Sequence, residues 1–401
     1  MKVDTEQKLE ILGAAAKYDI CASTSTKSPR PTGRNTIGSH APAGICHSYT
    51  PDGRCVSLLK VLMTNSCRND CKYCVNRVSN DFERSGFEPE ELAKLFLELY
   101  RRNYLEGIFL SSAVQKSSNY TMERMIQVAE ILRYKFKYRG YIHLKALPHT
   151  SPNLIERGAQ LADRMSVNLE SPNPDRLKLI ATEKNFMLDL VEPINVIQKQ
   201  IQKGLLNAGQ TTQFVVGAAG ESDLELLKTT NWLYKTKGLR RAYFSAYIPP
   251  FPSSSVYPEH SRGVPSSSVP LLREHRLYQA DWLMRFYEFA LEDLVLQNDG
   301  HLSLDLDPKM VAALKNRQRF PIEINKAPFK SLLQVPGIGP TAAKRIWRVR
   351  REHCFTDINE LKNVGVVIKR AKPFILINGK KQGDIRNIIT VKQLELFTWT
   401  S

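Results

Sequence analysis

The chain has 401 residues, of which 42% are hydrophobic and 24% are charged, so it can bury a full core and has room for one large and one smaller domain. It contains no apolar run of about 18 residues, and its N-terminal stretch lacks the apolar core of a signal peptide. These features predict a cytoplasmic protein outside the membrane. The net charge of +17 favours a polyanionic partner.

Charge and cysteines are both unevenly distributed. Residues 323–381 hold 13 Lys or Arg against 4 Asp or Glu, a surplus of nine, so about half of the net charge lies in this segment. Six of the seven cysteines fall within the first 74 residues. In a chain without secretion signals, such clustering indicates metal binding rather than disulfides.

The order of predicted elements begins with a helix near residues 6–17 and a loop rich in Ser, Thr, Pro and Gly over 22–44. From residue 57 onward, short apolar runs alternate with amphipathic helices, which predicts a parallel sheet with helices outside, curled into a full or partial barrel. The runs are 58–63, 107–110, 141–146, 165–169, 213–216 and 242–247, and the helices are 89–102, 122–134, 152–161, 188–203 and 222–237. Ligands of such folds bind where the strands end.

A Pro- and Ser-rich stretch, 249–270, then leads into a predicted helix over 271–296. The composition becomes basic near Pro321, so we place a domain boundary between 308 and 321. The predicted organisation is an N-terminal helix and cysteine-containing loop region (1–56), a partial barrel (57–310), an all-α basic domain (321–380) and a C-terminal tail (381–401).

Three cysteines with distinctive spacing follow the first predicted strand. Cys67, Cys71 and Cys74 are separated by three and two residues, and their thiolates can ligate three irons of a four-iron four-sulfur cluster. The fourth iron stays open to chelate S-adenosylmethionine, and a reduced cluster can then cleave a carbon–sulfur bond of that cofactor. The alternative is a structural zinc site, completed by Cys354 or by Cys21, Cys46, Cys55 or His47.

This CxxxCxxC motif, with the aromatic Tyr73 before its last cysteine, resembles that of the radical S-adenosylmethionine superfamily. The resemblance implies a partial (βα)6 barrel, reductive cleavage of the cofactor and an electron donor such as a flavodoxin or ferredoxin. It further implies cofactor contacts at the strand ends, although a Ser-Ser pair stands where the family usually has a Gly-Gly-Glu-like stretch. Ordinary loop hydrogen bonds are the alternative role of these residues, which are Tyr73, Ser111, Ser112, Lys145, Asn168, Glu170 and Gly217.

The upstream cysteines Cys21, Cys46 and Cys55 lie in loop-like sequence. Many members of the superfamily carry an auxiliary cluster, and these three thiols with His47 could hold a second iron–sulfur cluster. The alternative is that they are packed or incidental thiols.

The basic segment contains a Gly-Ile-Gly turn between two short helical patterns. Its glycines allow close backbone approach, and the amides that begin the next helix suit a phosphate. Residues 335–346 closely resemble the helix-hairpin-helix DNA-binding motif, and 360–374 resemble a degenerate second copy. The predicted DNA contacts, which favour sequence-independent backbone binding, are Gly337, Ile338, Gly339, Lys344, Arg345 and Arg348. A purely structural helical hairpin is the alternative.

Nearly the whole chain resembles bacterial radical S-adenosylmethionine proteins described as acting in DNA modification or repair. The sequence therefore predicts hydrogen abstraction from a base or sugar of DNA, and an extruded or single-stranded nucleotide would be needed to reach a barrel mouth. The alternatives are an RNA-modifying enzyme of the same chemistry and a non-catalytic iron–sulfur protein that binds DNA.

A final motif lies near the end of the sequence. Residues 393–397 resemble the pentapeptide with which bacterial repair proteins dock on the sliding clamp. Two leucines and a phenylalanine can fill an apolar groove, and the glutamine supplies a directional hydrogen bond. These side chains are Gln393, Leu394, Leu396 and Phe397. The alternative is a terminal strand over 388–399.

Overall fold

A computed structural model of the chain describes residues 5–16, 45–49, 55–249 and 268–388. The predicted clamp motif and Cys21 lie outside these residues. Among the described helices, none combines the length and the apolar character needed to cross a bilayer.

The chain divides into two compact units. The first comprises Met1–Glu221 and Thr229–Glu274, and the second comprises Ser222–Lys228 and His275–Ser401. The boundary that we expected between 308 and 321 therefore lies inside the second unit.

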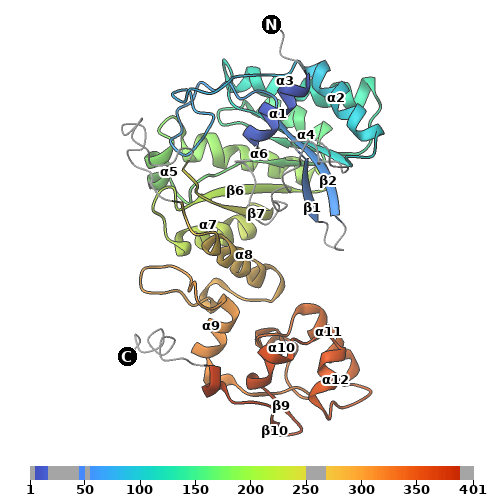
Figure 1. Cartoon of the computed structure of the whole chain (residues 1–401), viewed down its shortest axis with the longest axis vertical. Coiled ribbons are helices and arrows are strands. Elements are labelled where there is room, and N and C mark those ends of the chain that lie inside the picture. The colour runs from blue at the N-terminus through green and yellow to red at the C-terminus, as the bar shows by residue number, and fades with distance from the viewer. Residues whose placement is uncertain (1–4, 17–44, 50–54, 250–267, 389–401) are drawn as a thin grey trace, which may run out of the picture. The chain divides into compact units, whose positions relative to one another are not determined.

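Within the described residues, the first unit holds one seven-stranded sheet whose strands follow the order of the chain (Figure 1). Strands β2 to β7 pair in parallel, and β1 pairs antiparallel with β2 at the edge. The strands are β1 (Ile45–Tyr49), β2 (Cys55–Leu62), β3 (Gly107–Ser111), β4 (Tyr141–Lys145), β5 (Arg164–Ser166), β6 (Gln210–Val216) and β7 (Leu239–Ala246). The expected partial (βα)6 barrel is confirmed.

Helices α2, α3, α4 and α6 contact one another in succession and form a layer beside the sheet. Their starts follow from the sequence: the Ser117 side chain caps α3, and prolines occupy the first turns of α2, α4 and α6. The helices of the first unit are α1 (Thr5–Ala16), α2 (Pro89–Arg101), α3 (Ser118–Glu130), α4 (Pro152–Leu161), α5 (Pro174–Ile180) and α6 (Glu192–Gln202). Two further helices, α7 (Asp223–Thr236) and α8 (Leu271–Phe286), each have residues in both units. Short π-helical segments follow α3 and precede α6.

Two expectations for this part of the chain were wrong. Helix α8 ends at Phe286 rather than at residue 296, because Glu288 adopts a left-handed φ of 57° and the Phe289 amide turns back to the Leu283 carbonyl. Cys46 and Cys55 lie in strands β1 and β2 rather than in loops.

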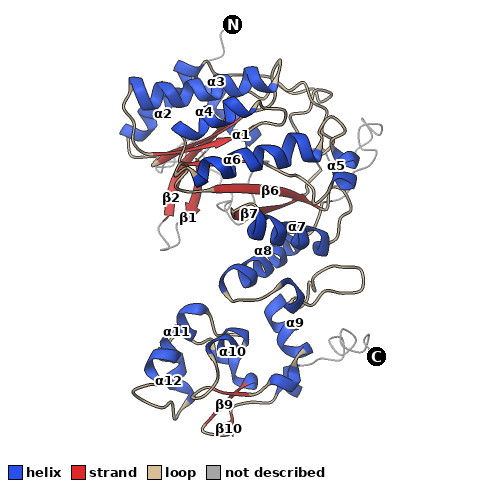
Figure 2. Cartoon of the chain, turned by 180° about the vertical axis from the view of Figure 1, so that it is seen from behind, coloured by secondary structure: helices blue, strands red, loops and turns tan. Residues whose placement is uncertain are grey.

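The second unit is built around short helices and a small sheet (Figure 2). Apolar side chains of α9, such as Met310 and Leu314, share one core with Ile338 and Ile346 of the basic segment. The helices are α9 (Pro308–Lys315), α10 (Phe329–Gln334), α11 (Pro340–Val349), α12 (Ile358–Asn363) and α13 (Ile368–Ala371). The domain is not all-α, because β8 (Ile322–Glu323), β9 (Ile375–Ile377) and β10 (Lys380–Lys381) form a three-stranded sheet.

Candidate functional site

The cysteine loop, residues 63–87, begins where β2 ends and is tied to neighbouring segments through its backbone. The Met63 amide donates to the Ser111 carbonyl at 2.8 Å, and the Lys72 amide donates to the Ile180 carbonyl at 2.8 Å. Cys71 is buried, while Cys67 and Cys74 are half-buried. The three thiols therefore lie at the carboxyl edge of the parallel sheet, the edge at which this fold class binds ligands.

Arg84 organises this loop. Its guanidinium donates to four backbone carbonyls, those of Asn65 at 2.6 Å, Asn76 at 2.9 Å, Arg77 at 2.7 Å and Asn80 at 2.7 Å. A planar guanidinium presents five donors in a fixed arrangement. Arg84 therefore joins Asn65, which precedes the three cysteines, to the 76–80 segment, which follows them. The sequence offered no motif that marks this arginine.

A buried cation lies against the cysteines. Lys184 is 9% exposed, and its Nζ lies 2.9 Å from the Tyr73 hydroxyl and 3.5 Å from a Glu170 carboxylate oxygen. Burial acts to lower the pKa of Lys184, but the negative charges of Cys71 and Glu170 outweigh it and the net pKa is raised. Lys184 is therefore positively charged beside the cysteines.

The same environment controls the protons of the neighbouring groups. Burial raises the pKa of Cys71 to about 11, against the opposing attraction of Lys184. Burial and then the Glu170 charge raise the pKa of Tyr73 well above its ordinary value, so the phenol stays neutral. A buried thiol of this kind loses its proton when a metal binds.

The donor set fits an iron–sulfur cluster. Among the described residues, no three His, Cys, Asp or Glu side chains converge as the ligands of one metal ion do. Three thiols spread along one loop can each bind a different iron, and the charge of Lys184 offsets the negative charge of the thiolates. Cys67, Cys71 and Cys74 would hold such a cluster.

The predicted cofactor-binding residues lie at the ends of strands β3 to β6, around the cysteine loop. Glu170 is joined to that loop through Lys184, and it adopts a left-handed φ of 64° with backbone hydrogen bonds to Gln213 and Val215. Ser111, Asn168 and Glu170 are buried, whereas Ser112 and Lys145 are half-buried.

Gly217 ends β6 in a turn that another residue type would strain. Its φ is 85°, and a Cβ there would come within 2.4 Å of Val269. The buried Glu221 carboxylate accepts the amides of Gly217 and Ala219, and burial raises its pKa. The assignment of these strand-end residues to S-adenosylmethionine stays a prediction.

One face of the sheet, which we call the inner face, is formed by every second residue of each strand, and it is polar. On this face the register aligns four side chains across four strands: Lys60, Phe109, His143 and Arg164. The residues between them, on the opposite face, are apolar and fully buried: Leu59, Ile108, Ile142 and Met165. Tyr141, Lys145, Ser166, Arg241 and Tyr243 continue this inner face. Parallel strands that are buried on both sides have continuous apolar runs, so the charged residues at alternate positions were a signal in the sequence for this polar face, and our prediction did not use it.

His143 is the centre of this inner face. It stacks on Phe109 with centroids 4.0 Å apart and planes 7° apart, and its Nε2 lies 2.9 Å from the Ser166 hydroxyl. Burial, followed by the charges of Arg164 and Lys60, lowers its pKa well below the ordinary value. The imidazole is therefore neutral, and the positive charge of the inner face resides on the Lys and Arg side chains.

The register separates the upstream cysteines along the edge of the sheet. Cys46 pairs with Leu58, and Cys55 pairs with Tyr49, so the two positions are three residues, or about 10 Å, apart along the ladder. An auxiliary cluster held by these residues stays a prediction.

The second unit contains two helical hairpins, α10–α11 and α12–α13, whose turns are alike. Gly337 and Gly365 have left-handed φ values of 88° and 95°, and the Val367 amide donates to the Gly337 carbonyl at 2.9 Å. A Cβ on Gly337 would approach the Val367 carbonyl oxygen within 2.6 Å, so only glycine fits this turn. The expected second hairpin is present.

Of the predicted DNA contacts, Lys344, Arg345 and Arg348 are exposed on α11, whereas Ile338 is buried in the core. Ile338 can contribute only its backbone. Arg350, another cation of the basic segment, is structural: it donates to the Ile324 and Ala327 carbonyls and lies 4.3 Å from the Trp347 ring.

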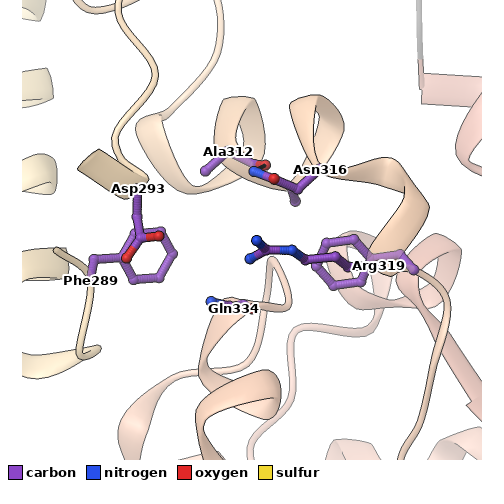
Figure 3. Close-up of a pocket in the computed structure, with 8 residues that line it drawn as sticks. Phe289, Asp293, Ala312, Asn316, Arg319 and Gln334 are labelled. Atoms are coloured by element: carbon purple, nitrogen blue, oxygen red, sulfur yellow. Dashed lines mark hydrogen bonds between the residues drawn. The ribbon is translucent and has the colours of Figure 1, made fainter. Parts of the chain in front are cut away.

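A small cavity in the second unit carries no ligand-binding role. Figure 3 shows Arg319 pointing into it between Asn316 and Gln334, with Asp293 facing the guanidinium. The cavity has a volume of about 20 Å³, which is room for a single water molecule.

Each part of the chain matches one known family model. Residues 61–233 match the sequence model of the Radical SAM superfamily, and residues 318–370 match that of the helix-hairpin-helix motif. No curated protein matches the chain.

Three solved structures are similar to the chain, which spans roughly half of their length. The FeFe-hydrogenase maturase HydG from Carboxydothermus hydrogenoformans is 18% identical, with a TM-score of 0.39 over 50% of this chain and 47% of that chain. A radical SAM methyltransferase from Sphaerobacter thermophilus is 15% identical, with a TM-score of 0.35 over 50% and 61%. The cobalamin-dependent S-adenosylmethionine radical enzyme OxsB is 12% identical, with a TM-score of 0.32 over 82% and 53%. The chain is thus similar to the Radical SAM superfamily over residues 61–233 and to the helix-hairpin-helix motif over residues 318–370.

Proposed function

We propose that the chain is a radical S-adenosylmethionine enzyme that modifies or repairs a base or sugar of DNA. The observation that carries this proposal is the presence in one chain of the cysteine loop and of two helical hairpins with exposed cations, Lys344, Arg345 and Arg348. Such hairpins with a basic surface suit the phosphate backbone of DNA.

In this proposal the chain's own residues hold and orient the reacting groups. Cys67, Cys71 and Cys74 ligate the cluster, Arg84 fixes their loop, and Lys184 balances the charge of the thiolates. S-adenosylmethionine bound beside these residues would supply reductive carbon–sulfur cleavage and hydrogen-atom abstraction from the substrate, with the electron coming from a donor such as a reduced flavodoxin or ferredoxin. The strand-end residues Ser111, Ser112, Lys145, Asn168, Glu170 and Gly217, together with Tyr73, would orient that cofactor.

The inner face of the sheet supports a substrate that carries phosphate. Lys60, Lys145, Arg164 and Arg241 belong to this face on four different strands, and cationic side chains bind phosphate oxygens through charge-assisted hydrogen bonds. A nucleotide would have to leave the base stack to reach such a face, so single-stranded or distorted DNA is the preferred substrate.

The same proposal includes a second iron–sulfur cluster and docking on the sliding clamp. Cys21, Cys46 and Cys55 are candidates for a second cluster, and Gln393, Leu394, Leu396 and Phe397 are candidates for docking on the sliding clamp. Replacing the three cysteines together would lower the iron content by about half if each cluster carries the same number of irons, and unchanged iron would reject the second cluster.

The function is tested by anaerobic incubation of reconstituted protein with S-adenosylmethionine, a reductant and either DNA or RNA. We expect 5′-deoxyadenosine to form, and to form faster with DNA than with RNA of the same sequence. Faster formation with RNA would favour the RNA-modifying alternative. Binding of DNA without any cleavage of the cofactor would favour the non-catalytic one.

A further inference from the structure

A groove of about 560 Å³ lies within the second unit, between α8 and the turns of the two hairpins. Tyr278, Trp282 and Tyr287 line one side, and the 337–339 turn with Val367 lines the other. Small-molecule sites commonly have volumes of about 300 to 1,000 Å³, so the groove is large enough for a nucleotide-sized ligand.

Trp282 is an exposed aromatic side chain that its neighbours hold in place. It is 49% exposed, and its ring lies 4.4 Å from that of Phe286. The Arg285 guanidinium lies 5.7 Å from the Trp282 ring and is fixed by a 2.6 Å ion pair to the fully buried Asp281. A fixed, half-exposed ring is the feature with which proteins stack unpaired bases.

The opposite side of the groove is formed by the backbone of the 337–339 turn, which the buried Lys309 side chain holds in position. The Lys309 Nζ donates to the Ile338 carbonyl at 2.6 Å, and it lies 4.5 Å from the Tyr287 ring. Gly339 faces the Tyr287 hydroxyl, which a Cβ there would meet at 3.4 Å. The 337–339 turn is therefore held by Lys309, Tyr287 and the second hairpin as one wall of the groove.

The lining of the groove includes one acidic residue, Asp307, which is ion-paired with Arg370, and the charge around this pair is positive. Arg345 Nη1 lies 3.5 Å from the position that a Cβ on Gly365 would occupy, and Gly365 and Arg370 both line the groove. The basic segment around them has a surplus of nine positive charges. An anionic ligand with an aromatic part complements these features better than an apolar peptide does.

We propose that this groove holds one unpaired nucleotide of a DNA strand, with its base stacked on Trp282 and its phosphate beside the 337–339 turn and Arg345. The proposal rests on the proposed function, since it requires that the chain bind DNA. It adds a preference for DNA with an unpaired nucleotide over fully paired DNA, because paired bases in a duplex are not available for stacking. Contacts between the hairpins and the DNA backbone would not give this preference.

The test uses the full chain and two DNA duplexes of one sequence, one fully paired and one with a single bulged 2-aminopurine. The variants are Trp282→Ala, Trp282→Tyr and Val367→Glu, and the matched control is Tyr134→Ala, which removes an exposed ring of the first unit that does not line the groove. Binding affinity and 2-aminopurine fluorescence are measured for both duplexes.

We expect Trp282→Ala to weaken binding of the bulged duplex by about tenfold, as the loss of one stacked base does, while binding of the paired duplex changes less than about twofold. Trp282→Tyr should keep most of the affinity, and Tyr134→Ala should behave like the unchanged protein. Val367→Glu should weaken binding of the bulged duplex while the Trp282 ring stays in place. A loss of affinity in this variant would therefore show that the groove binds the nucleotide and that the effect of Trp282→Ala is not caused by misfolding.

The failures are distinguishable. If the unchanged protein binds neither duplex, both the DNA function and the groove proposal are wrong. If it binds both duplexes equally, and neither Trp282→Ala nor Val367→Glu changes the ratio, DNA binding stands and the groove proposal is overturned.

Discussion

Lys184 and Tyr73 are 111 residues apart in the sequence, and they meet through a hydrogen bond of 2.9 Å between Nζ and the phenolic oxygen. The same ammonium group lies 3.5 Å from a Glu170 oxygen. The end of β5, the loop after α5 and the cysteine loop are therefore joined at one buried positive charge.

Replacing Lys184 with Met should lower the iron content of the reconstituted protein severalfold and destabilise the first unit by about 3 kcal/mol or more, because Glu170 would lose its buried partner. Lys178→Met, in α5, is the matched control for loss of a lysine. Iron and sulfide per chain and the unfolding midpoint are measured. Iron content equal to that of the control would contradict the assigned role of Lys184.

Arg84→Lys should lose iron binding and thermal stability almost as fully as Arg84→Met does. A lysine has three donors on one nitrogen and cannot reach the four carbonyls that the guanidinium joins. We expect both variants to bind less iron and to unfold at a lower temperature, with Arg139→Lys as the control. Retention of full iron by Arg84→Lys would show that charge alone organises the cysteine loop.

These two residues also mark how far sequence reasoning reaches. The cysteine spacing and the strand–helix alternation predicted the barrel and the cluster loop, because both are local patterns. Arg84 and Lys184 act through contacts between distant segments and carry no motif. β1 was missed because Ile45–Tyr49 is short and partly polar, and it becomes a strand by pairing with the edge of β2.

Lys309 should give the second unit a pH-dependent stability. Burial lowers its pKa to about 7, whereas in the unfolded chain a lysine titrates near 10.4. Below pH 7 both states hold the proton; between about 7 and 10 the unfolded state holds more, so stability rises with pH.

The unfolding midpoint of the unchanged protein should therefore rise relative to that of Lys309→Met as the pH increases from about 7 to 10. Lys315→Met, which replaces the exposed lysine at the end of α9, should show no such trend. A constant difference between the unchanged protein and Lys309→Met across this range would refute the lowered pKa.

Replacing Lys344 and Arg345 with Ala should weaken DNA binding and reduce the slope of its salt dependence by about two, since each lost phosphate contact removes about 0.9. Lys380→Ala with Lys381→Ala removes the same charge from exposed positions in β10 and should change the slope less. Equal slopes for the two double variants would assign the binding to overall charge rather than to α11.

The most direct measurement of the central claim follows hydrogen from DNA into the cleaved cofactor. The reconstituted protein is incubated anaerobically with S-adenosylmethionine, a reductant and deuterated DNA containing unpaired nucleotides, and the mass of the 5′-deoxyadenosine is determined. We predict deuterium in that product, and no product from the variant with Cys67, Cys71 and Cys74 replaced by Ala. Abundant 5′-deoxyadenosine without deuterium, from protein shown to bind the DNA, would contradict hydrogen abstraction from DNA.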